Sequence, residues 1–117
     1  MEFNELTYAC ALNRIFINNT RLTKSIAEYF PYPSELFNTS EENLREIFHS
    51  NERYISAIKD KKILEECSRE VSWCRNNNIK IVYYNDQDYP RRLKECPDAP
   101  ALLFVKGNIS LDNRRMV

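Results

Sequence analysis

Apolar residues recur every three or four positions through residues 1–78, which is the spacing that gives a helix one buried face. The repeat predicts helices over about residues 4–16, 21–30, 40–48, 52–59 and 60–77, with a short helical turn over residues 33–37. Asparagines and prolines interrupt the repeat between these segments, as expected where helices end. The sequence therefore predicts a mainly helical domain over residues 1–78.

Residues with helix-capping chemistry stand at several of the predicted boundaries. Thr39 and Glu42 are three positions apart, so the side chain of each can satisfy a free amide at the other. Thr20 stands before the second helix, and Asp60 stands before the longest one. We expect both to accept hydrogen bonds from the first free amides of those helices.

The hydrophobic pattern changes at residue 79. Residues 79–84 read Ile-Lys-Ile-Val-Tyr-Tyr, a short β-branched and aromatic run that predicts a strand. Residues 101–105 are all apolar, which is typical of a strand covered on both faces. We expect the two strands to lie side by side or against the helices, with a helical turn over residues 91–95 between them.

The segment from Tyr89 to Asn108 contains three prolines and the only glycine of the chain. Proline fixes φ and donates no amide, so Pro90 is suited to begin the helical turn, with Leu93 packing beneath it. Two further prolines then direct the chain into the second strand. The expected structural motif comprises Tyr89, Pro90, Leu93, Pro97, Pro100 and Gly107, the glycine serving as a turn residue with positive φ.

Charge is balanced over the whole chain but unevenly distributed along it. Seventeen basic and seventeen acidic residues cancel, which argues against a surface that binds polyanions everywhere. Residues 1–78 carry a net charge of −2, and residues 79–117 carry +2. Any contact with phosphate is therefore expected in the second part of the chain.

The second part of the chain contains both basic residues and tyrosines within a short stretch. They could form a nucleic-acid patch in which tyrosines 83, 84 and 89 stack on bases. The alternative, which we favour, is that the charges are solvated and the tyrosines cover a core, because a phosphate site needs convergence that sequence cannot show. The candidate nucleic-acid-binding residues are Arg91, Arg92, Lys94, Lys106, Arg114 and Arg115.

Cysteine, histidine and tryptophan give no indication of catalysis or of a metal site. The four cysteines show no Cys-x-x-Cys spacing, so we expect buried reduced thiols. His49 ends a predicted helix and is expected at the surface. Trp73 is either an anchor for a partner or packing between the helices and the strands, and its place beside Val71 and Cys74 favours packing. No cofactor or membrane segment is predicted, and a cytoplasmic location is the default expectation.

The second part of the chain carries a series of short motifs: Asp88-Tyr89-Pro90, Leu93, Cys96, Asp98-Ala99-Pro100, residues 103–108 and Leu111-Asp112-Asn113. Together they resemble the segment that leads into the Rossmann-like domain of the DNA-processing protein A family, also called Smf. That family begins with a helical domain of the sterile-alpha-motif (SAM) or helix-hairpin-helix type, and residues 1–84 are similar to it. The resemblance implies a helical SAM-like domain over residues 1–78 and a truncated Rossmann-like α/β domain that begins over residues 79–117.

For an intact protein, the resemblance implies a homodimer that binds single-stranded DNA and passes it to RecA, as a recombination mediator in natural transformation. In such proteins a strand equivalent to Met116 and Val117 continues into a glycine-rich turn whose amides can face a phosphate. We therefore expect this chain to be an amino-terminal fragment that ends just before that turn. Its helical domain would then be mainly an accessory or interaction domain.

The first helical hairpin departs from the family pattern. Members commonly carry a glycine-containing turn there, of the kind that lets backbone amides approach DNA in helix-hairpin-helix proteins. Residues 17–20 read Ile-Asn-Asn-Thr, so a side chain stands where the backbone would have to approach. Together with the net negative charge of residues 1–78, this disfavours phosphate binding by the first hairpin.

Two other functional classes stay open. One is a protein-interaction module without DNA binding, and the other is a nucleotide-ligand-binding Rossmann protein of a different family, which would share the strand pattern. An enzyme is disfavoured because no nucleophile with a base, carboxylate pair or metal spacing can be assembled. We also expect self-association through residues 79–117, because strands of an incomplete sheet expose an edge and apolar faces.

Overall fold

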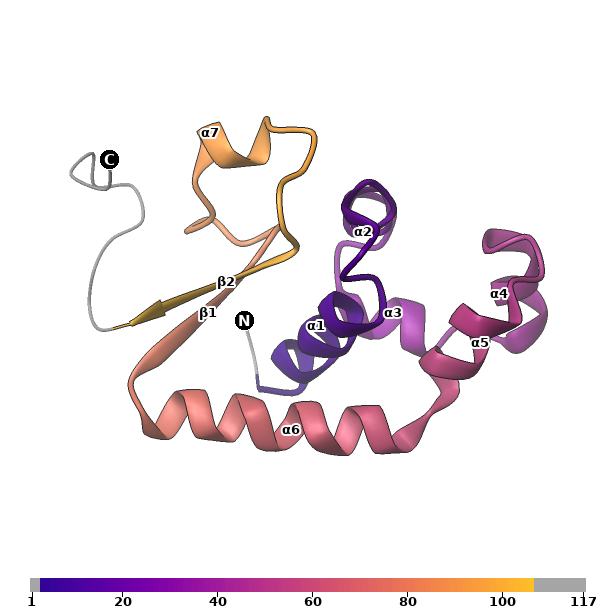
Figure 1. The fold of residues 1–117 in the computed structure, drawn as a ribbon, viewed down its shortest axis with the longest axis horizontal. Helices are drawn as coiled ribbons and strands as arrows, with labels where there is room; N and C mark the ends of the chain where they lie inside the picture. Colours follow the sequence, from indigo (N-terminus) through magenta and orange to yellow (C-terminus); the bar gives the residue numbers. More distant parts are fainter. Residues whose placement is uncertain (1–2, 107–117) are drawn as a thin grey trace.

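A computed structural model describes residues 3–106 of the chain, and Figure 1 shows the arrangement of its elements. Within these residues the protein is mainly helical, with a small two-stranded antiparallel sheet. The elements in chain order are α1 (Phe3–Ile15), α2 (Thr20–Tyr29), α3 (Pro33–Phe37), α4 (Glu41–Ile47), α5 (Glu52–Lys59), α6 (Lys61–Asn76), β1 (Ile79–Tyr83), α7 (Arg91–Lys94) and β2 (Leu102–Lys106).

Helix α1 is the centre of the fold. It packs against α6, α3 and α5 and also contacts both strands. The long α6 runs beneath α1 and connects the helices on one side of the molecule with the β-hairpin on the other (Figure 1). Arg14 on α1 joins the two helices by ion pairs to Glu70, at 2.9 Å, and to Glu66, at 3.7 Å. Because these groups are partly exposed, the pairs fix orientation more than they stabilise the fold.

The helix ends follow the predicted boundaries closely, with two corrections to the capping residues. Asn19 caps α2 in place of Thr20, because its Oδ1 accepts a hydrogen bond from the Leu22 amide at 3.2 Å. Ser40 caps α4 in place of Thr39, by accepting from the Asn43 amide. Asp60 caps α6 as expected, accepting from the Lys62 amide at 2.9 Å.

Three residues in the left-handed region end two of the helices. His49 and Ser50 follow α4 with φ of 51° and 63°, and Asn78 follows α6 with φ of 58°. Asparagine tolerates this conformation better than most residues, which explains how the asparagine run ends α6. His49 lies exposed at this helix end, as the sequence predicts.

The two strands pair antiparallel in a register that places Ile81 opposite Phe104 and Tyr83 opposite Leu102. They therefore lie side by side, as the sequence predicts. The amide of Tyr84 continues the ladder by donating to the Ala101 carbonyl at 2.9 Å. A lysine on β1, Lys80, reaches back to form an ion pair with Asp88 beyond the turn.

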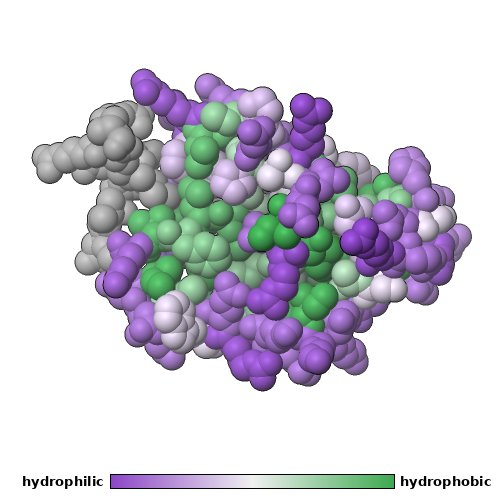
Figure 2. All heavy atoms as spheres, in the orientation of Figure 1, coloured by the Kyte–Doolittle hydropathy of each residue, from purple (hydrophilic) through white to green (hydrophobic). Residues whose placement is uncertain are grey.

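The expectation that residues 101–105 are covered on both faces is wrong. Strand β1 is buried from Ile81 to Tyr83, but β2 is only partly covered, and the side chain of Phe104 is 47% exposed. Among residues 3–106, β2 pairs only with β1 and so has a free edge. Figure 2 shows a continuous apolar area over this hairpin, bordered by polar residues.

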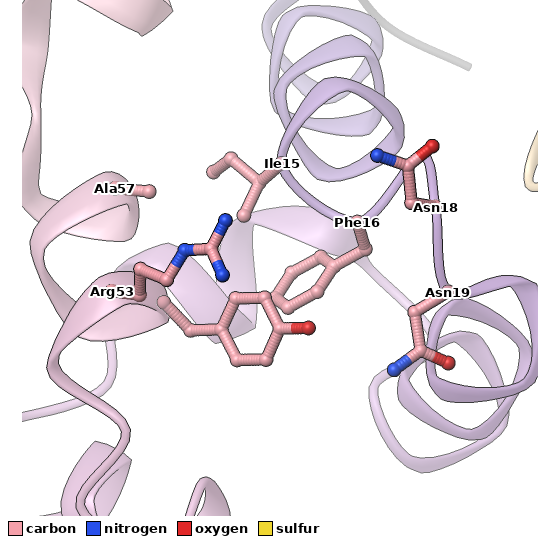
Figure 3. A pocket seen from close by; sticks show the side chains of 7 residues that line it. Ile15, Phe16, Asn18, Asn19, Arg53 and Ala57 are labelled. Atoms are coloured by element: carbon pink, nitrogen blue, oxygen red, sulfur yellow. The ribbon is translucent and has the colours of Figure 1, made fainter.

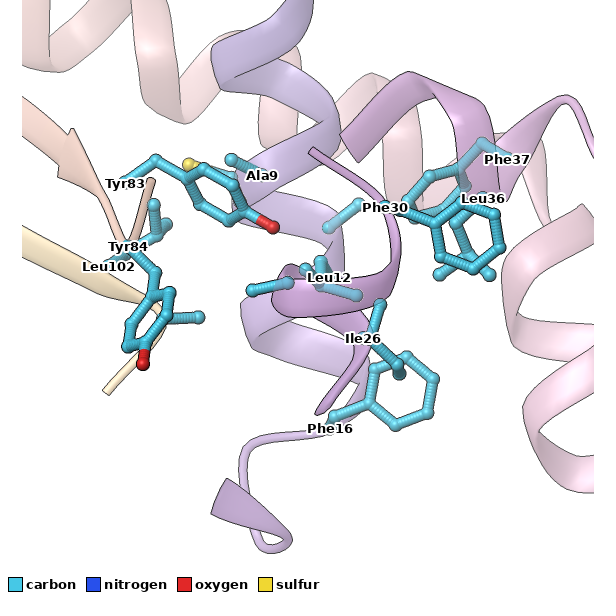
Figure 4. Close-up of a cluster of buried hydrophobic side chains, with 14 of the residues drawn as sticks. Ala9, Leu12, Phe16, Ile26, Phe30, Leu36, Phe37, Tyr83, Tyr84 and Leu102 are labelled. Atoms are coloured by element: carbon cyan, nitrogen blue, oxygen red, sulfur yellow. The ribbon is translucent and has the colours of Figure 1, made fainter. Parts of the chain in front are cut away.

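A single cluster of buried apolar side chains runs from the helices into the hairpin. Figure 4 shows Leu12 of α1 between Tyr84 and Leu102 on one side and Ile26 and Phe16 on the other. Hydrophobic burial therefore joins the helices to the sheet through α1. The division into domains at residue 78 stays a prediction, and the packing across it is continuous.

Trp73 does not pack between the helices and the strands. Its side chain is 58% exposed on α6, on the face opposite the buried residues Cys67, Val71 and Cys74. Helical spacing explains this, since Trp73 follows the exposed Arg69 by four positions and continues the solvent-facing row. The expectation of a packing role is therefore wrong.

The four cysteines are all free thiols, and three of them are buried. Cys10 lies on α1, and Cys67 and Cys74 lie on α6, while Cys96 follows α7 and is exposed. Burial raises the pKa of Cys10 to about 12 and also raises the pKa of Cys67 and of Cys74. The expectation of buried thiols is thus confirmed for three cysteines and wrong for Cys96.

We expect one of the four thiols to react readily with a disulfide reagent such as DTNB at pH 8, and all four to react after unfolding in urea. The thiolate is the reactive form, and a raised pKa keeps the buried thiols protonated at this pH. The measurement is the release of thionitrobenzoate with time. Replacing Cys96 with serine should remove the fast phase, and a fast phase that persists in this variant would contradict the prediction.

Candidate nucleic-acid interface

The basic residues around α7 share one short helical turn. Arg91 and Arg92 are exposed, whereas Lys94 is half-buried with its Nζ 4.7 Å from the centre of the Tyr84 ring. The Tyr84 hydroxyl in turn donates to the Lys94 carbonyl at 3.4 Å. Lys94 is therefore held against the tyrosine by a cation–π contact, which leaves the two arginines as the solvated charges of this turn.

The other predicted basic residues do not join this turn. Lys106 ends β2 opposite Ile79, and Figure 1 shows this end of the strand apart from α7. Arg114 and Arg115 lie outside the described residues, as does Gly107. The structure thus brings together Arg91, Arg92 and Lys94, and it places Lys106 elsewhere.

The tyrosines proposed to stack on bases are covered. Tyr83, Tyr84 and Tyr89 are all buried, and the rings of Tyr84 and Tyr89 contact each other with centroids 5.3 Å apart. This confirms the interpretation that the tyrosines cover a core. Burial also raises the pKa of Tyr89 to about 12, so its phenol stays protonated and acts as a donor.

Tyr89 fixes the segment between the two strands. Its hydroxyl donates to the Pro100 carbonyl at 2.6 Å and so ties the start of the segment to its end. Pro90 comes directly before α7 rather than within it, and Leu93 packs half-buried against the core. Pro97 is exposed and Pro100 is half-buried at the approach to β2. These contacts hold residues 84–101, called the joint from here on, in a fixed path between the two strands.

The joint docks on helix α2. The side-chain amide of Asn85 donates to the Ala27 carbonyl at 2.7 Å, and Lys24 reaches the Cys96 carbonyl at 3.5 Å. These contacts, between residues far apart in the sequence, hold the joint against α2. The loops on either side of α7 are therefore positioned by helices that the motif itself does not include.

A second feature lies at the turn between α1 and α2. An open hollow of about 560 Å³ is lined by Ile15, Phe16, Asn18, Asn19, Arg53, Tyr54 and Ala57. Residues 15–19 come from the end of α1 and the turn, and residues 53–57 come from α5. The ring of Tyr54, which lines the hollow, stands against that of Phe16, with centroids 4.7 Å apart.

Sequence reasoning did not find this hollow. The helical repeat marks Tyr54, Ile55 and Ile58 as the inward face of α5 and says nothing of Arg53. Helices α2, α3 and α4 lie between Asn18 and Arg53 in the sequence, and only the folded chain brings the two residues to one site. The asparagines at the turn were the available signal, because they are polar residues that the helical pattern leaves unexplained.

Replacing Arg91 and Arg92 together with alanine tests the candidate interface, and we expect it to lower the affinity for a single-stranded oligonucleotide by less than about threefold, with a slightly smaller salt dependence. The two charges are exposed on one turn, and Lys106 does not converge with them. Fluorescence anisotropy with a labelled oligonucleotide measures the effect. The matched control replaces Lys61 and Lys62, two adjacent exposed lysines on α6, and a loss of order a hundredfold for the arginine pair alone would overturn the expectation.

Comparison with known proteins gives a family match in the second part of the chain. Residues 80–117 match the family model described as DNA recombination-mediator protein A. No curated protein and no solved structure matches the chain. The match begins in β1 and includes α7, β2 and the joint, whereas helices α1 to α6 lie outside it.

Residues 3–106 contain neither a membrane-spanning helix nor a cluster of metal-binding side chains. None of the helices there is long and apolar enough to cross a membrane. No group of three or more histidine, cysteine or carboxylate side chains is placed to hold a metal ion within that range.

Proposed function

We propose that this protein is a DNA recombination mediator of the DNA-processing protein A type. The observation that carries the proposal is the family match over residues 80–117. The short motifs of residues 88–106 support it, because they fold into α7, most of the joint and β2, next to the helices α1 to α6. In this proposal the joint begins a Rossmann-like domain, and the protein acts as a homodimer in the cytoplasm.

The role of the protein would be to hold single-stranded DNA and to assist the loading of RecA during natural transformation. Helices α1 to α6 would serve mainly as an accessory domain. Their charge supports this assignment, since residues 1–78 carry a net charge of −2 and a strong electrostatic contribution to DNA binding would need the opposite sign.

The test is RecA-dependent strand exchange on single-stranded DNA that is already coated with single-strand-binding protein. The protein should shorten the lag before exchange, and it should co-purify with RecA from its own host. Acceleration that also occurs without RecA would not support the proposal. A lag that stays unchanged at every protein concentration, without co-purification, would reject it.

A protein-interaction module without DNA binding is the second candidate. The exposed Trp73 favours it, because an indole ring left in solvent on a helix is a common anchor for a partner. The two candidates differ in a gel-shift titration with single-stranded oligonucleotide. Binding to RecA with no shift at any salt concentration would favour the interaction module.

A further inference from the structure

The hollow between α1, the following turn and α5 presents hydrogen-bond donors from two sides. Figure 3 shows the guanidinium of Arg53 extending from α5 toward the hollow, with the amide nitrogens of Asn18 and Asn19 on the opposite side. The Oδ1 of Asn19 already accepts from the Leu22 amide, which fixes the direction of its amide group and leaves Nδ2 toward the hollow. Together these three side chains form a set of donors around one open space.

The charge of the lining is positive. None of the seven lining residues carries a carboxylate, and Arg53 forms no ion pair with any residue in the described part of the chain. The neighbouring Glu52 is engaged by Arg45, with Nε and Oε1 3.3 Å apart. The guanidinium therefore keeps its full donor capacity, and its planar fork matches the oxygens of a phosphate or carboxylate.

The shape of the hollow indicates a ligand larger than a single carboxylate. Its volume of about 560 Å³ falls within the range of small-molecule sites. Ile15 and Ala57 add apolar surface beside the donors, and Tyr54 is half-buried with its ring on Phe16. Because the lining has both donor groups and apolar surface, a ligand with an anionic group and a flat or apolar part fits it better than a lone anion does.

We propose that this hollow binds one nucleotide unit, with the phosphate on Arg53, Asn18 and Asn19 and the sugar or base on the apolar wall. The phosphate can come from single-stranded DNA or from a free mononucleotide. The sequence disfavours phosphate binding by the α1–α2 hairpin, because the turn at residues 17–20 lacks a glycine that would let the backbone approach the phosphate closely. Here side chains supply the donors, and the arginine comes from a different helix. The DNA source rests on the proposed function, whereas the mononucleotide source does not.

The site holds a single charge, so its affinity is expected to be weak. One guanidinium and two neutral amides correspond to one phosphate contact, and the surrounding residues 1–78 are net acidic. We expect dissociation constants in the millimolar range for thymidine 5′-monophosphate. The hollow would then add one contact to DNA held mainly by another domain, which is consistent with an accessory role.

NMR of the ¹⁵N-labelled chain tests the proposal residue by residue. Thymidine 5′-monophosphate should shift the side-chain signals of Asn18, Asn19 and the Arg53 Nε–H, whereas thymidine, which lacks the phosphate, should not. Arg53→Gln should weaken the binding roughly tenfold, and Arg53→Lys should weaken it less. The control Arg69→Gln removes another exposed arginine, on α6, and should leave the affinity unchanged.

Titration with an oligothymidylate distinguishes DNA from a free mononucleotide as the source of the phosphate. It also distinguishes failure of the hollow as a binding site from failure of the proposed function. Shifts at the hollow with an oligothymidylate as well as with the mononucleotide support DNA as a source, and shifts with the mononucleotide alone assign the free nucleotide. Oligonucleotide shifts confined to residues 91–106, with none at the hollow for any probe, overturn the inference and leave the proposed function standing. Equal shifts with thymidine, or equal affinity in Arg53→Gln, also overturn it.

Discussion

Replacing Leu12 with alanine is expected to lower the free energy of unfolding by about 3 kcal/mol. Leu12 has 0% exposure and lies near the end of α1, which contacts three other helices and both strands. Figure 4 shows its side chain between Leu102 of β2 and the ring of Phe16. The substitution removes three carbons where tightly packed neighbours on several elements limit collapse, so a cavity term adds to the lost burial.

Urea unfolding followed by circular dichroism measures this loss. The matched control is Ile17→Ala, since Ile17 follows the same helix with 62% exposure and its truncation should change stability by less than about 0.5 kcal/mol. Because the cluster around Leu12 is continuous, a single transition is expected. Equal effects of the two substitutions would show that α1 is not the packing centre, and two separate transitions would show that the hairpin folds apart from the helices.

The sequence predicted nearly the whole arrangement of helices and strands. The longest helix was expected over residues 60–77 and is observed at Lys61–Asn76, and both strands lie within two residues of the expected positions. The reason is that the helical repeat and the asparagine interruptions are local signals that agree with each other. Capping residues were predicted less well, because adjacent polar residues such as Asn19 and Thr20 have similar chemistry and only backbone geometry decides between them.

The sequence could not show which distant segments cover each face of a helix or strand. Residues 101–105 are all apolar, yet Phe104 is exposed because no described element covers that part of β2. Trp73 resembles a core residue by type but falls on the solvent-facing row of α6. Burial of a single residue depends on neighbours from distant segments, and composition does not report them.

The two candidate sites differ in whether their residues are neighbours in the sequence. The basic turn of α7 was visible in the sequence because its residues are adjacent. The hollow was not, because Arg53 meets Asn18 and Asn19 only through the packing of α5 on α1. Only the fold shows that Tyr83, Tyr84 and Tyr89 are buried and so do not stack on bases. Their residue type is the same in a core and at a nucleic-acid surface.

The second large effect is expected on self-association. Strand β2 has a free edge within residues 3–106, and its residues Phe104 and Val105 are exposed and partly exposed. Figure 2 shows an apolar area over the hairpin of β1 and β2. An edge strand with unpaired amides beside an apolar face favours pairing with another copy of the chain. We therefore expect the average mass of the chain to rise with concentration, through contacts in residues 79–117.

Phe104→Lys should weaken this self-association by at least about tenfold, because pairing would then bury a lysine where an apolar ring was. Strand β1 and the helical layer are expected to remain folded, since Phe104 is 47% exposed and not part of the buried cluster. Sedimentation equilibrium over a range of concentrations measures the effect. Ile17→Lys places the same charge on an exposed apolar residue at the α1–α2 turn and should leave the mass unchanged. A strictly monomeric wild-type chain at high concentration would contradict the prediction, and an unchanged dimer in Phe104→Lys would exclude this face as the interface.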